Sequence, residues 1–203
     1  MPNLFEDRRS VGDFDPARPL SDELLREIVR LAAFAPSANN LQPWRLIAVR
    51  SDEGKRRLHE VASRQARILA APVTLIVVAD SEGFGADNPS WAELVERAGG
   101  DRTRVNRSIA VSAARYGATP ETRTKFAHKN SSLFAMSLML AAKSLGVDSH
   151  PMDGFDVEGV TREFGLRPNE QPSILIALGY HDDAKPLAPR RRRRTYEELV
   201  EEV

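Results

Sequence analysis

The chain contains no cysteine among its 203 residues. This absence excludes disulfide bonds, thiolate catalysis, iron–sulfur clusters and zinc sites with cysteine ligands. A surplus of charge of one sign is also missing, because 29 lysine and arginine residues balance 29 aspartate and glutamate residues. A chain without net charge creates no overall field that would attract polyanions, so we expect neither nucleic acid nor a membrane as a partner.

Long apolar runs are absent as well. No apolar stretch is long enough to span a bilayer, and the charged start of the chain, residues 1–8, lacks the apolar core of a signal peptide. We therefore expect a soluble protein in the cytoplasm. Since 41% of the residues are hydrophobic and no repeat or clear linker divides the sequence, we expect residues 1–203 to form a single domain.

Several common catalytic motifs do not occur. The chain lacks the glycine-rich fingerprint of dinucleotide-binding domains, the Gly-Lys-Ser/Thr phosphate loop and the Gly-x-Ser-x-Gly elbow of serine hydrolases. Its four histidines show no spacing typical of metal ligands, and we expect no bound metal. Nucleotide hydrolysis, serine hydrolysis and zinc catalysis therefore have no support in the sequence. The histidines are His59, His128, His150 and His181.

Hydrophobic periodicity predicts an alternation of helices and strands. Apolar residues at helical spacing follow Ser21, a typical N-cap, and stop before Pro36. The β-branched run at 73–79 is the best candidate for a central strand. Residues 80–125 show little pattern apart from one short helix, and we interpret them as an inserted excursion. The predicted helices are 22–35, 55–69, 91–97, 126–145 and 157–164, and the predicted strands are 46–49, 73–79 and 173–180.

Two polar segments early in the chain point to a ligand. Arg8, Arg9 and Ser10 place two guanidinium groups beside a hydroxyl, and this combination suits a phosphate dianion. Residues 36–43 form a polar turn bounded by prolines, whose donors and acceptors suit the edge of a planar heterocycle. Together the segments predict a phosphorylated aromatic cofactor. Taken alone, the two arginines would more often be a solvated pair. An exposed basic tail with affinity for any polyanion is the alternative for residues 190–194.

Four short islands occur in order along the chain. They are Arg-Arg-Ser at 8–10 followed by Phe14, Ala-Pro-Ser with Asn-x-Gln-Pro-Trp at 35–44, Leu-Gly-Val-Asp-Ser-His-Pro-Met-Asp-Gly-Phe at 145–155, and a basic run before Thr195-Tyr196-Glu197-Glu198. With these islands the sequence resembles the nitroreductase family of oxidoreductases, which use flavin mononucleotide (FMN) and NAD(P)H. The second and third islands are specific, and the match covers most of the chain apart from about 80–125.

The resemblance implies an α+β fold with a mixed, mainly antiparallel sheet flanked by helices. It also implies an intertwined homodimer in which the long helix at 126–145 lies in the subunit interface. The FMN sites would then lie between the subunits. The excursion at 80–125 would shape the substrate pocket, and so the least readable segment would decide the substrate.

The same resemblance assigns residues to the flavin. Backbone amides of Asp153 and Gly154 would lie near flavin N5, and we name no catalytic side chain with certainty. Asn40, rather than Asn39, occupies the family's asparagine position two residues before Gln42. Five consecutive arginines leave the register of the phosphate contacts in the tail ambiguous. The implied cofactor contacts are Arg8, Arg9, Ser10, Pro36, Ser37, Ala38, Asn40, Gln42, Asn130, Pro151, Met152, Asp153, Gly154, Arg191 and Arg193, with residues 36–40 reaching the flavin of the partner subunit.

One position departs from the family pattern. The family often has a basic residue at the position of Gly12, where its charge approaches the pyrimidine ring of the flavin, and this chain lacks that charge. We hypothesise that Arg67 supplies it, because a cation near N1 and O2 stabilises the anionic reduced flavin.

The implied activity is a ping-pong reaction on one open flavin face. NADH or NADPH gives hydride to N5 and leaves, and an electron-poor acceptor then takes its place: a nitroaromatic compound, a quinone, an enone or an activated carbonyl compound. The alternative is a flavin carrier or regulatory protein without reductase turnover. A third possibility is an interaction protein that binds an anionic partner through its basic tail and holds no flavin.

Overall fold

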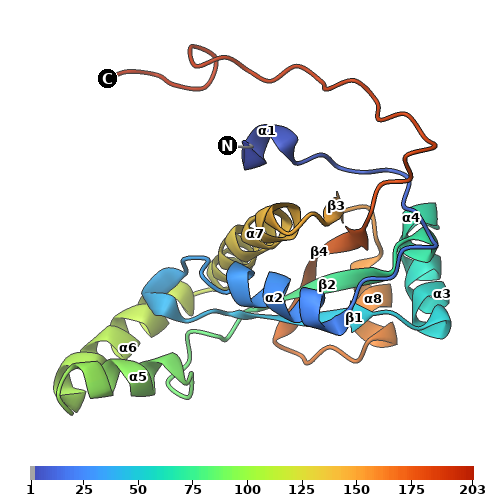
Figure 1. Cartoon of the computed structure of the whole chain (residues 1–203). Coiled ribbons are helices and arrows are strands. Elements are labelled where there is room, and N and C mark those ends of the chain that lie inside the picture. Colours follow the sequence, from blue (N-terminus) through green and yellow to red (C-terminus); the bar gives the residue numbers. More distant parts are fainter. Residues whose placement is uncertain (1–2) are drawn as a thin grey trace.

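A four-stranded antiparallel sheet lies at the centre of the chain in the computed structural model, which describes residues 3–203. The order of its strands is β1-β2-β4-β3 (Figure 1). Ser10 and Ser149 add one parallel bridge beside β3. The α+β fold with a mainly antiparallel sheet is therefore confirmed. The strands are β1 (Trp44–Val49), β2 (Val73–Asp80), β3 (Asp148–Met152) and β4 (Glu170–Gly179).

Helices cover both faces of this sheet. One layer packs α2 and α7 against one face, and α3, α4 and α8 lie against the other, whereas α5 and α6 project away from the sheet (Figure 1). No helix within residues 3–203 is long and apolar enough to cross a membrane. The helices are α1 (Leu4–Asp7), α2 (Asp22–Ala32), the 3-10 turn η1 (Ala38–Asn40), α3 (Asp52–Val61), α4 (Ala66–Ala70), α5 (Ser90–Arg97), α6 (Arg102–Tyr116), α7 (Pro120–Ser144) and α8 (Val157–Glu163).

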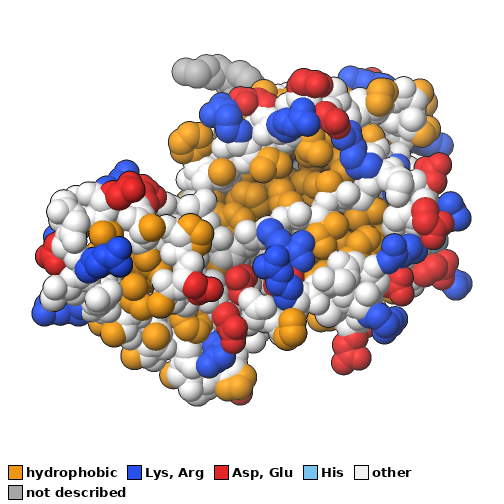
Figure 2. All heavy atoms as spheres, turned by 90° about the horizontal axis from the view of Figure 1, so that it is seen from below, with side chains coloured by type: hydrophobic (Ala, Val, Ile, Leu, Met, Phe, Trp, Pro, Cys, Tyr) orange, Lys and Arg blue, Asp and Glu red, His pale blue; other side chains and the backbone are white. Residues whose placement is uncertain are grey.

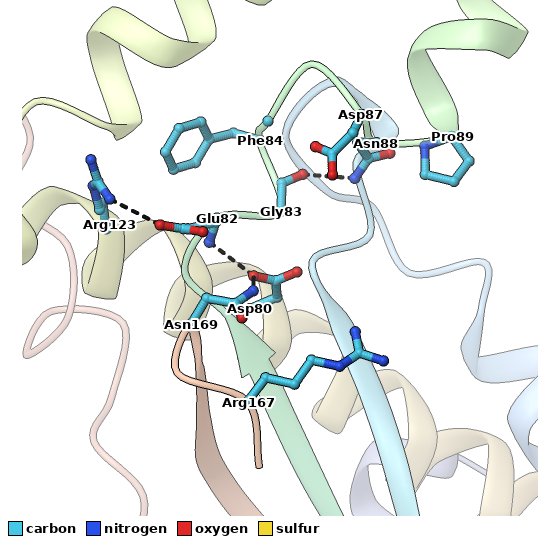
Figure 3. A pocket seen from close by; sticks show the side chains of 11 residues that line it. Asp80, Glu82, Gly83, Phe84, Asp87, Asn88, Pro89, Arg123, Arg167 and Asn169 are labelled. Atoms are coloured by element: carbon cyan, nitrogen blue, oxygen red, sulfur yellow. Dashed lines mark hydrogen bonds and ion pairs between the residues drawn. The ribbon is translucent and has the colours of Figure 1, made fainter.

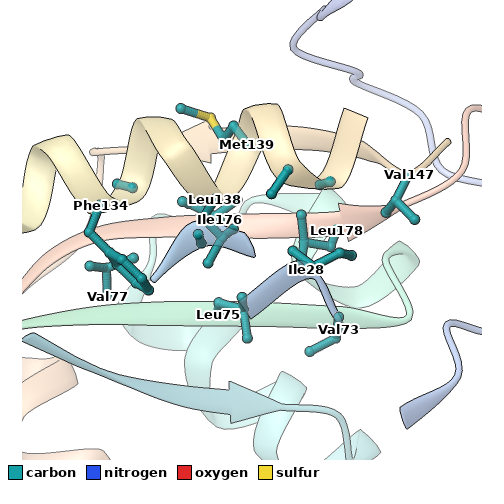
Figure 4. Close-up of a cluster of buried hydrophobic side chains, with 14 of the residues drawn as sticks. Ile28, Val73, Leu75, Val77, Phe134, Leu138, Met139, Val147, Ile176 and Leu178 are labelled. Carbon is teal, nitrogen blue, oxygen red and sulfur yellow. The ribbon is translucent and has the colours of Figure 1, made fainter. Parts of the chain in front are cut away.

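Strand β2 is central because it is apolar on both faces. Its residues from Val73 to Ala79 are buried, as expected for a β-branched run covered on two sides. Figure 4 shows one of the two cores, where side chains of α2 and α7 meet those of β2 and β4. This packing holds the two helices and the sheet in fixed positions. The labelled residues of this core include Ile28, Leu75, Phe134, Leu138, Ile176 and Leu178.

Two predicted helices differ from the observed ones. The helix expected at 55–69 is split in two, because Ser63 and Arg64 adopt positive φ angles of 52° and 51°, which a continuous helix does not allow. Helix α7 begins at Pro120, six residues before the expected position 126. Thr119 and Thr122 form a capping box at this start, and Pro120 lies in the first turn of the helix. The apolar pattern at 126–145 marks only the later part of this helix, because its first turns are polar.

Helix α6 was not predicted at all. Its 15 residues bury only two side chains, those of Val105 and Ser112, so it shows almost no apolar periodicity. Its start is fixed by the carboxylate of Asp101, which accepts hydrogen bonds from the amides of Thr103 and Arg104. The excursion at 80–125 is therefore largely helical.

Apolar side chains remain exposed on the outer surface of the chain. Leu133 and Met136 on α7 are exposed, as is Phe34 after α2. Figure 2 shows one face on which hydrophobic side chains gather in a band framed by charged ones. The last residues, 186–203, extend away from the body (Figure 1) and carry five more exposed apolar side chains: Leu187, Tyr196, Leu199, Val200 and Val203. Exposed apolar surface of this kind is typical of contact regions.

One ion pair joins the beginnings of β1 and β4 across β2. The guanidinium of Arg45 donates to both carboxylate oxygens of Glu170 at 2.6 and 2.7 Å, and the amide of Arg167 donates to the same carboxylate at 2.8 Å. The side chain of Glu170 is 3% exposed, and that of Arg45 is 38% exposed. These hydrogen bonds, chiefly that from Arg45, lower the pKa of Glu170.

Removal of Arg45 should destabilise the protein more than removal of an exposed arginine. We expect Arg45→Met to lower the free energy of unfolding by about 1–3 kcal/mol at neutral pH. This loss is smaller than for a fully buried ion pair, because Arg45 is more than a third exposed. Arg56→Met is the matched control, since Arg56 and Glu53 form an exposed pair, and it should change stability by less than about 0.5 kcal/mol.

The difference should depend on pH. Because the folded pKa of Glu170 lies below its unfolded value of about 4.3, the ion pair stabilises the fold above that value and loses its effect as the pH falls through the folded pKa. Urea unfolding of the three proteins at several pH values measures this. Equal stability of Arg45→Met and Arg56→Met at pH 7 would contradict the assignment.

Candidate functional site

The segment that contains Arg8, Arg9 and Ser10 runs along the edge of β3. Ser10 forms the parallel bridge with Ser149, and the amide of Val11 donates to the carbonyl of Ser149 at 3.1 Å. The Nδ1–H of His150 donates to the carbonyl of Val11 at 2.7 Å. These contacts place the first sequence island beside the third, next to the turn that follows β3.

Positive charge gathers at this edge. Burial and the nearby charges of Arg190, Arg193 and Arg9 lower the pKa of Arg8. Arg190 Nη1 donates to the Arg8 carbonyl at 3.4 Å, and the Arg9 guanidinium donates to the carbonyl of Ala188. Arg8 Nη1 is buried and has no hydrogen-bond partner. Since burial of an unpaired donor is costly, this atom indicates that the site takes an anionic group.

No carboxylate neutralises this cluster. Within the described residues, neither Arg8 nor Arg9, Arg190 or Arg193 forms an ion pair with an aspartate or glutamate. Arg192, by contrast, pairs with Glu198 at 2.6 Å. Arg191 is exposed, and its carbonyl accepts a hydrogen bond from Arg193. The structure thus places Arg190 next to Arg8. The sequence did not single out Arg190 as a contact.

Arg67 on α4 lies next to Gly12. A Cβ atom built at Gly12 would lie 3.9 Å from Arg67 Nη2. Arg67 Nη1 donates weakly to Gln65 at 3.5 Å, and its Nε is buried without a partner. A basic side chain at position 12 and Arg67 would therefore reach into the same space.

His150 is a second residue whose place in the site the sequence did not indicate. Burial, together with the charges of Arg67 and Arg8, lowers the pKa of its imidazole, and its hydrogen bond to Val11 opposes this only in part. The ring is therefore neutral at pH 7 and adds no charge to the cluster. The only sequence signal for His150 is its position within the third island.

The turn after β3 carries the backbone groups that the resemblance assigned to N5. Pro151 and Met152 are the last residues of β3, and Met152 is buried, whereas Asp153 and Gly154 are exposed. Gln65 at the start of α4 donates to the carbonyl of Gly154 at 3.0 Å. This bond ties the turn to the element that carries Arg67.

The loop at 36–42 has a fixed, unusual backbone. Asn39, Asn40 and Gln42 have φ angles of 51°, 56° and 47°, in the left-handed region that asparagine tolerates better than most residues. The Ser37 hydroxyl accepts from the Gln42 amide at 3.0 Å, and Gln42 Nε2 donates to the Asn40 carbonyl at 3.3 Å. The loop presents its polar groups in one defined shape.

Helices α6 and α7 hold this loop. Asn130 is 1% exposed; its Oδ1 accepts from the amide of Ala38 at 2.9 Å, and its Nδ2 donates to the Phe126 carbonyl at 2.7 Å. Asn39 Nδ2 donates to the Ser112 hydroxyl at 3.0 Å. Asn130 thus positions the loop, whatever else it contacts. Pro36 leads into the loop from α2.

The two candidate groups lie apart in one chain. The loop at 36–42 lies beside α6, whereas residues 8–12 run along β3 near α4, on the opposite side of the molecule in Figure 1. No hydrogen bond of the described part of the chain joins them. A single chain therefore does not bring its own two groups around one ligand.

A separate cavity of about 420 Å³ opens at the end of β2 (Figure 3). Some of its charged groups are paired: Asp80 accepts from Asn169 Nδ2 at 2.7 Å and from the amide of Glu82 at 2.9 Å. Arg123 pairs with Glu82 at 3.1 Å. No three His, Cys, Asp or Glu side chains within residues 3–203 come together as metal ligands, here or elsewhere. Among the described residues that line this cavity, none is one that the sequence assigned to the flavin.

Comparisons with known proteins show the family to which the chain belongs. The model of the nitroreductase family matches residues 5–180. The chain is 38% identical over 173 residues to a protein of Thermus thermophilus named NADH dehydrogenase, a match that covers 85% of this chain and 82% of the relative. It is 31% identical over 179 residues to YdgI of Bacillus subtilis, described as an NAD(P)H nitroreductase, with 87% and 86% of the two chains covered.

Solved structures have the same fold. The crystal structure of ydfN from Bacillus subtilis, described as a nitroreductase, has a TM-score of 0.89 at 27% identity and covers 98% of this chain and 97% of that one. A protein of Exiguobacterium sibiricum, also described as a nitroreductase and solved in complex with FMN, has a TM-score of 0.78 at 25% identity, with 93% and 91% covered. The chain belongs to the nitroreductase family and, as a member, is an NAD(P)H-dependent oxidoreductase.

Proposed function

We propose that the chain is an FMN-binding domain over its whole length, 1–203, and that two copies form a homodimer which reduces electron-poor acceptors with NADH or NADPH. One observation carries the proposal. Arg8, Arg9, Arg190 and Arg193 form a cluster without a carboxylate, in which Arg8 Nη1 is a buried donor that lacks an acceptor. A phosphate dianion would supply both the charge and the acceptor that this cluster lacks.

The residues present fit FMN in more than its phosphate. Ser10 lies beside the cluster and adds a hydroxyl. Arg67 has a buried Nε that has no hydrogen-bond partner among the described residues, and it lies beside Gly12, the position at which the family often has a cation. In the family pattern the amides of Asp153 and Gly154 would face N5 as hydrogen-bond donors. When bound, FMN would supply the chemistry of the reaction, namely hydride acceptance at N5 and its return to an acceptor.

A second copy of the chain would complete the site. The loop of Pro36, Ser37, Ala38 and Asn40 lies too far from the arginine cluster of its own chain to share a ligand with it (Figure 1). Exposed apolar side chains on α7 and in the tail support an intertwined dimer, with burial on the order of 2,000–5,000 Å². In such a dimer the loop of one subunit meets the cluster of the other. Binding of FMN and dimerisation would then be coupled.

The acceptor is proposed only as a class. Nitroaromatic compounds, quinones, enones and activated carbonyl compounds all accept hydride or electron pairs. A structural neighbour, CLA-ER, is an enone reductase with a TM-score of 0.81 at 26% identity. One open face over the ring would make the two substrates bind in turn, which gives ping-pong kinetics. We place the enzyme in the cytoplasm, where NADH and NADPH are made and used.

The first test separates a reductase from a flavin carrier. We expect the purified protein to bind about one FMN per chain, and NADH or NADPH to bleach the flavin absorbance without oxygen. Addition of a quinone or nitroaromatic compound should then restore the absorbance. Flavin that neither nucleotide bleaches would select the carrier, and protein that takes up no flavin would contradict both readings.

The second test concerns Arg67. We expect Arg67→Ala to lower the two-electron reduction potential of bound FMN by about 20–60 mV, because about 1–3 kcal/mol of stabilisation of the reduced anion is lost. Arg67→Lys keeps the charge and should keep most of the potential. Gly12→Lys added to Arg67→Ala should restore it, since position 12 faces the space that Arg67 leaves.

Spectroelectrochemical titration of the four proteins measures these potentials. The same potential in wild type and Arg67→Ala would contradict the role of Arg67. A lowered potential that Gly12→Lys fails to raise would contradict the view that the two positions serve one space.

A further inference from the structure

A small pocket of about 250 Å³ lies between α6 and the loop at 36–42. Its lining includes Arg107, Ser108, Ser112 and Arg115 of α6 and Asn39 of the loop. The proposed flavin site uses Ser112 to hold its loop but gives no role to the two arginines.

The two arginines belong to one stripe of the helix. Arg107 and Arg115 are eight residues apart, about two turns and 12 Å along the axis, so both side chains rise on the same side of α6. Ser108 and Ser112 form the neighbouring stripe. Long guanidinium side chains can converge over this distance on a group held between them.

Neither arginine has a partner. Within the described residues, the side chains of Arg107 and Arg115 form no ion pair and no hydrogen bond, although both line the pocket. Two other arginines of the excursion are paired: Arg97 binds Glu93 and Arg123 binds Glu82, each at 3.1 Å. Two cations that share a pocket repel each other. An anion between them would offset this repulsion and accept a charge-assisted hydrogen bond from each.

The pocket is joined directly to the proposed flavin loop. Ser112 is 2% exposed, and its hydroxyl accepts the hydrogen bond from Asn39 Nδ2. Asn39 and Asn40 are adjacent, so a group in this pocket lies within a few residues of the flavin contacts. A volume of 250 Å³ is smaller than a typical site for a whole ligand, which is about 300–1,000 Å³. It suits one end group of a larger molecule.

We propose that Arg107 and Arg115 form a subsite for an oxyanion, a phosphate or carboxylate, carried by a substrate that reacts at the flavin. The proposal rests on the flavin function above. Binding of a remote anionic group would hold the reacting end in place without contact with the chemistry itself. Two sources supply such a group: the 2′-phosphate of NADPH, or an acidic substituent of the acceptor.

The test uses the FMN-loaded protein and Arg107→Met, Arg115→Met and the double variant. Arg104→Met is the control, because Arg104 lies on the same helix but lines a different pocket. Steady-state kinetics compare NADPH with NADH, and 4-nitrobenzoate with nitrobenzene. Calorimetry measures the affinity of adenosine 2′,5′-bisphosphate and of 5′-AMP, which requires no turnover.

We expect the double variant to raise KM about tenfold or more for either NADPH or 4-nitrobenzoate. The KM of the matching compound without the extra anionic group, NADH or nitrobenzene, should change less than about twofold. A selective effect on NADPH, with weaker binding of adenosine 2′,5′-bisphosphate, identifies the nucleotide phosphate as the source. A selective effect on 4-nitrobenzoate identifies the acceptor. Arg104→Met should resemble wild type in every assay.

Equal KM values for wild type and the double variant with all four compounds would overturn the proposal, and so would an equal loss with all four. The FMN content and its bleaching by nucleotide are recorded for each variant. If wild type binds no flavin, the proposed function has failed. If all variants bind and reduce FMN normally but show no selective change in KM, only the oxyanion subsite has failed.

Discussion

The site depends on one constraint: the described part of the chain provides no carboxylate to neutralise its cluster of arginines. Arg8 is partly buried beside Arg9, Arg190 and Arg193, and burial together with these three charges lowers its pKa. A fold tolerates such repulsion only where a ligand offsets it or where stability elsewhere is sufficient. The apolar β2 and the ion pair of Arg45 with Glu170 stabilise the sheet on whose edge the cluster lies.

The sheet also separates the parts of the proposed site. Residues 8–12 are fixed to the edge of β3, and the loop at 36–42 is fixed to α6 and α7 by Ser112 and Asn130. Both attachments use buried hydrogen-bonding groups, so neither segment moves toward the other cheaply. A ligand that needs both groups must therefore take them from two chains. Helix α6, which carries Arg107 and Arg115, is tied to the same loop through Ser112.

The sequence predicted those features that leave a local pattern. The run of β-branched residues located β2, Ser21 and Asp156 located two helix starts, and the islands located the loop and the turn after β3. Helix α6 left no pattern because it buries only two side chains, and the break at Ser63 depends on backbone angles that no sequence period records. Arg190 and His150 were missed because their roles arise from charge and burial contributed by distant segments.

A mixed dimer tests most directly whether two chains build one site. Arg8→Ala impairs the cluster and Asn40→Asp impairs the loop, so each homodimer should bind FMN at least about tenfold more weakly than wild type. Two different affinity tags allow the heterodimer to be purified, and fluorescence titration counts its tight sites. With shared sites, the heterodimer contains one doubly impaired site and one intact site, so we predict one tight FMN per two chains. A heterodimer without any tight site would show that each chain builds its site alone, and would contradict this account.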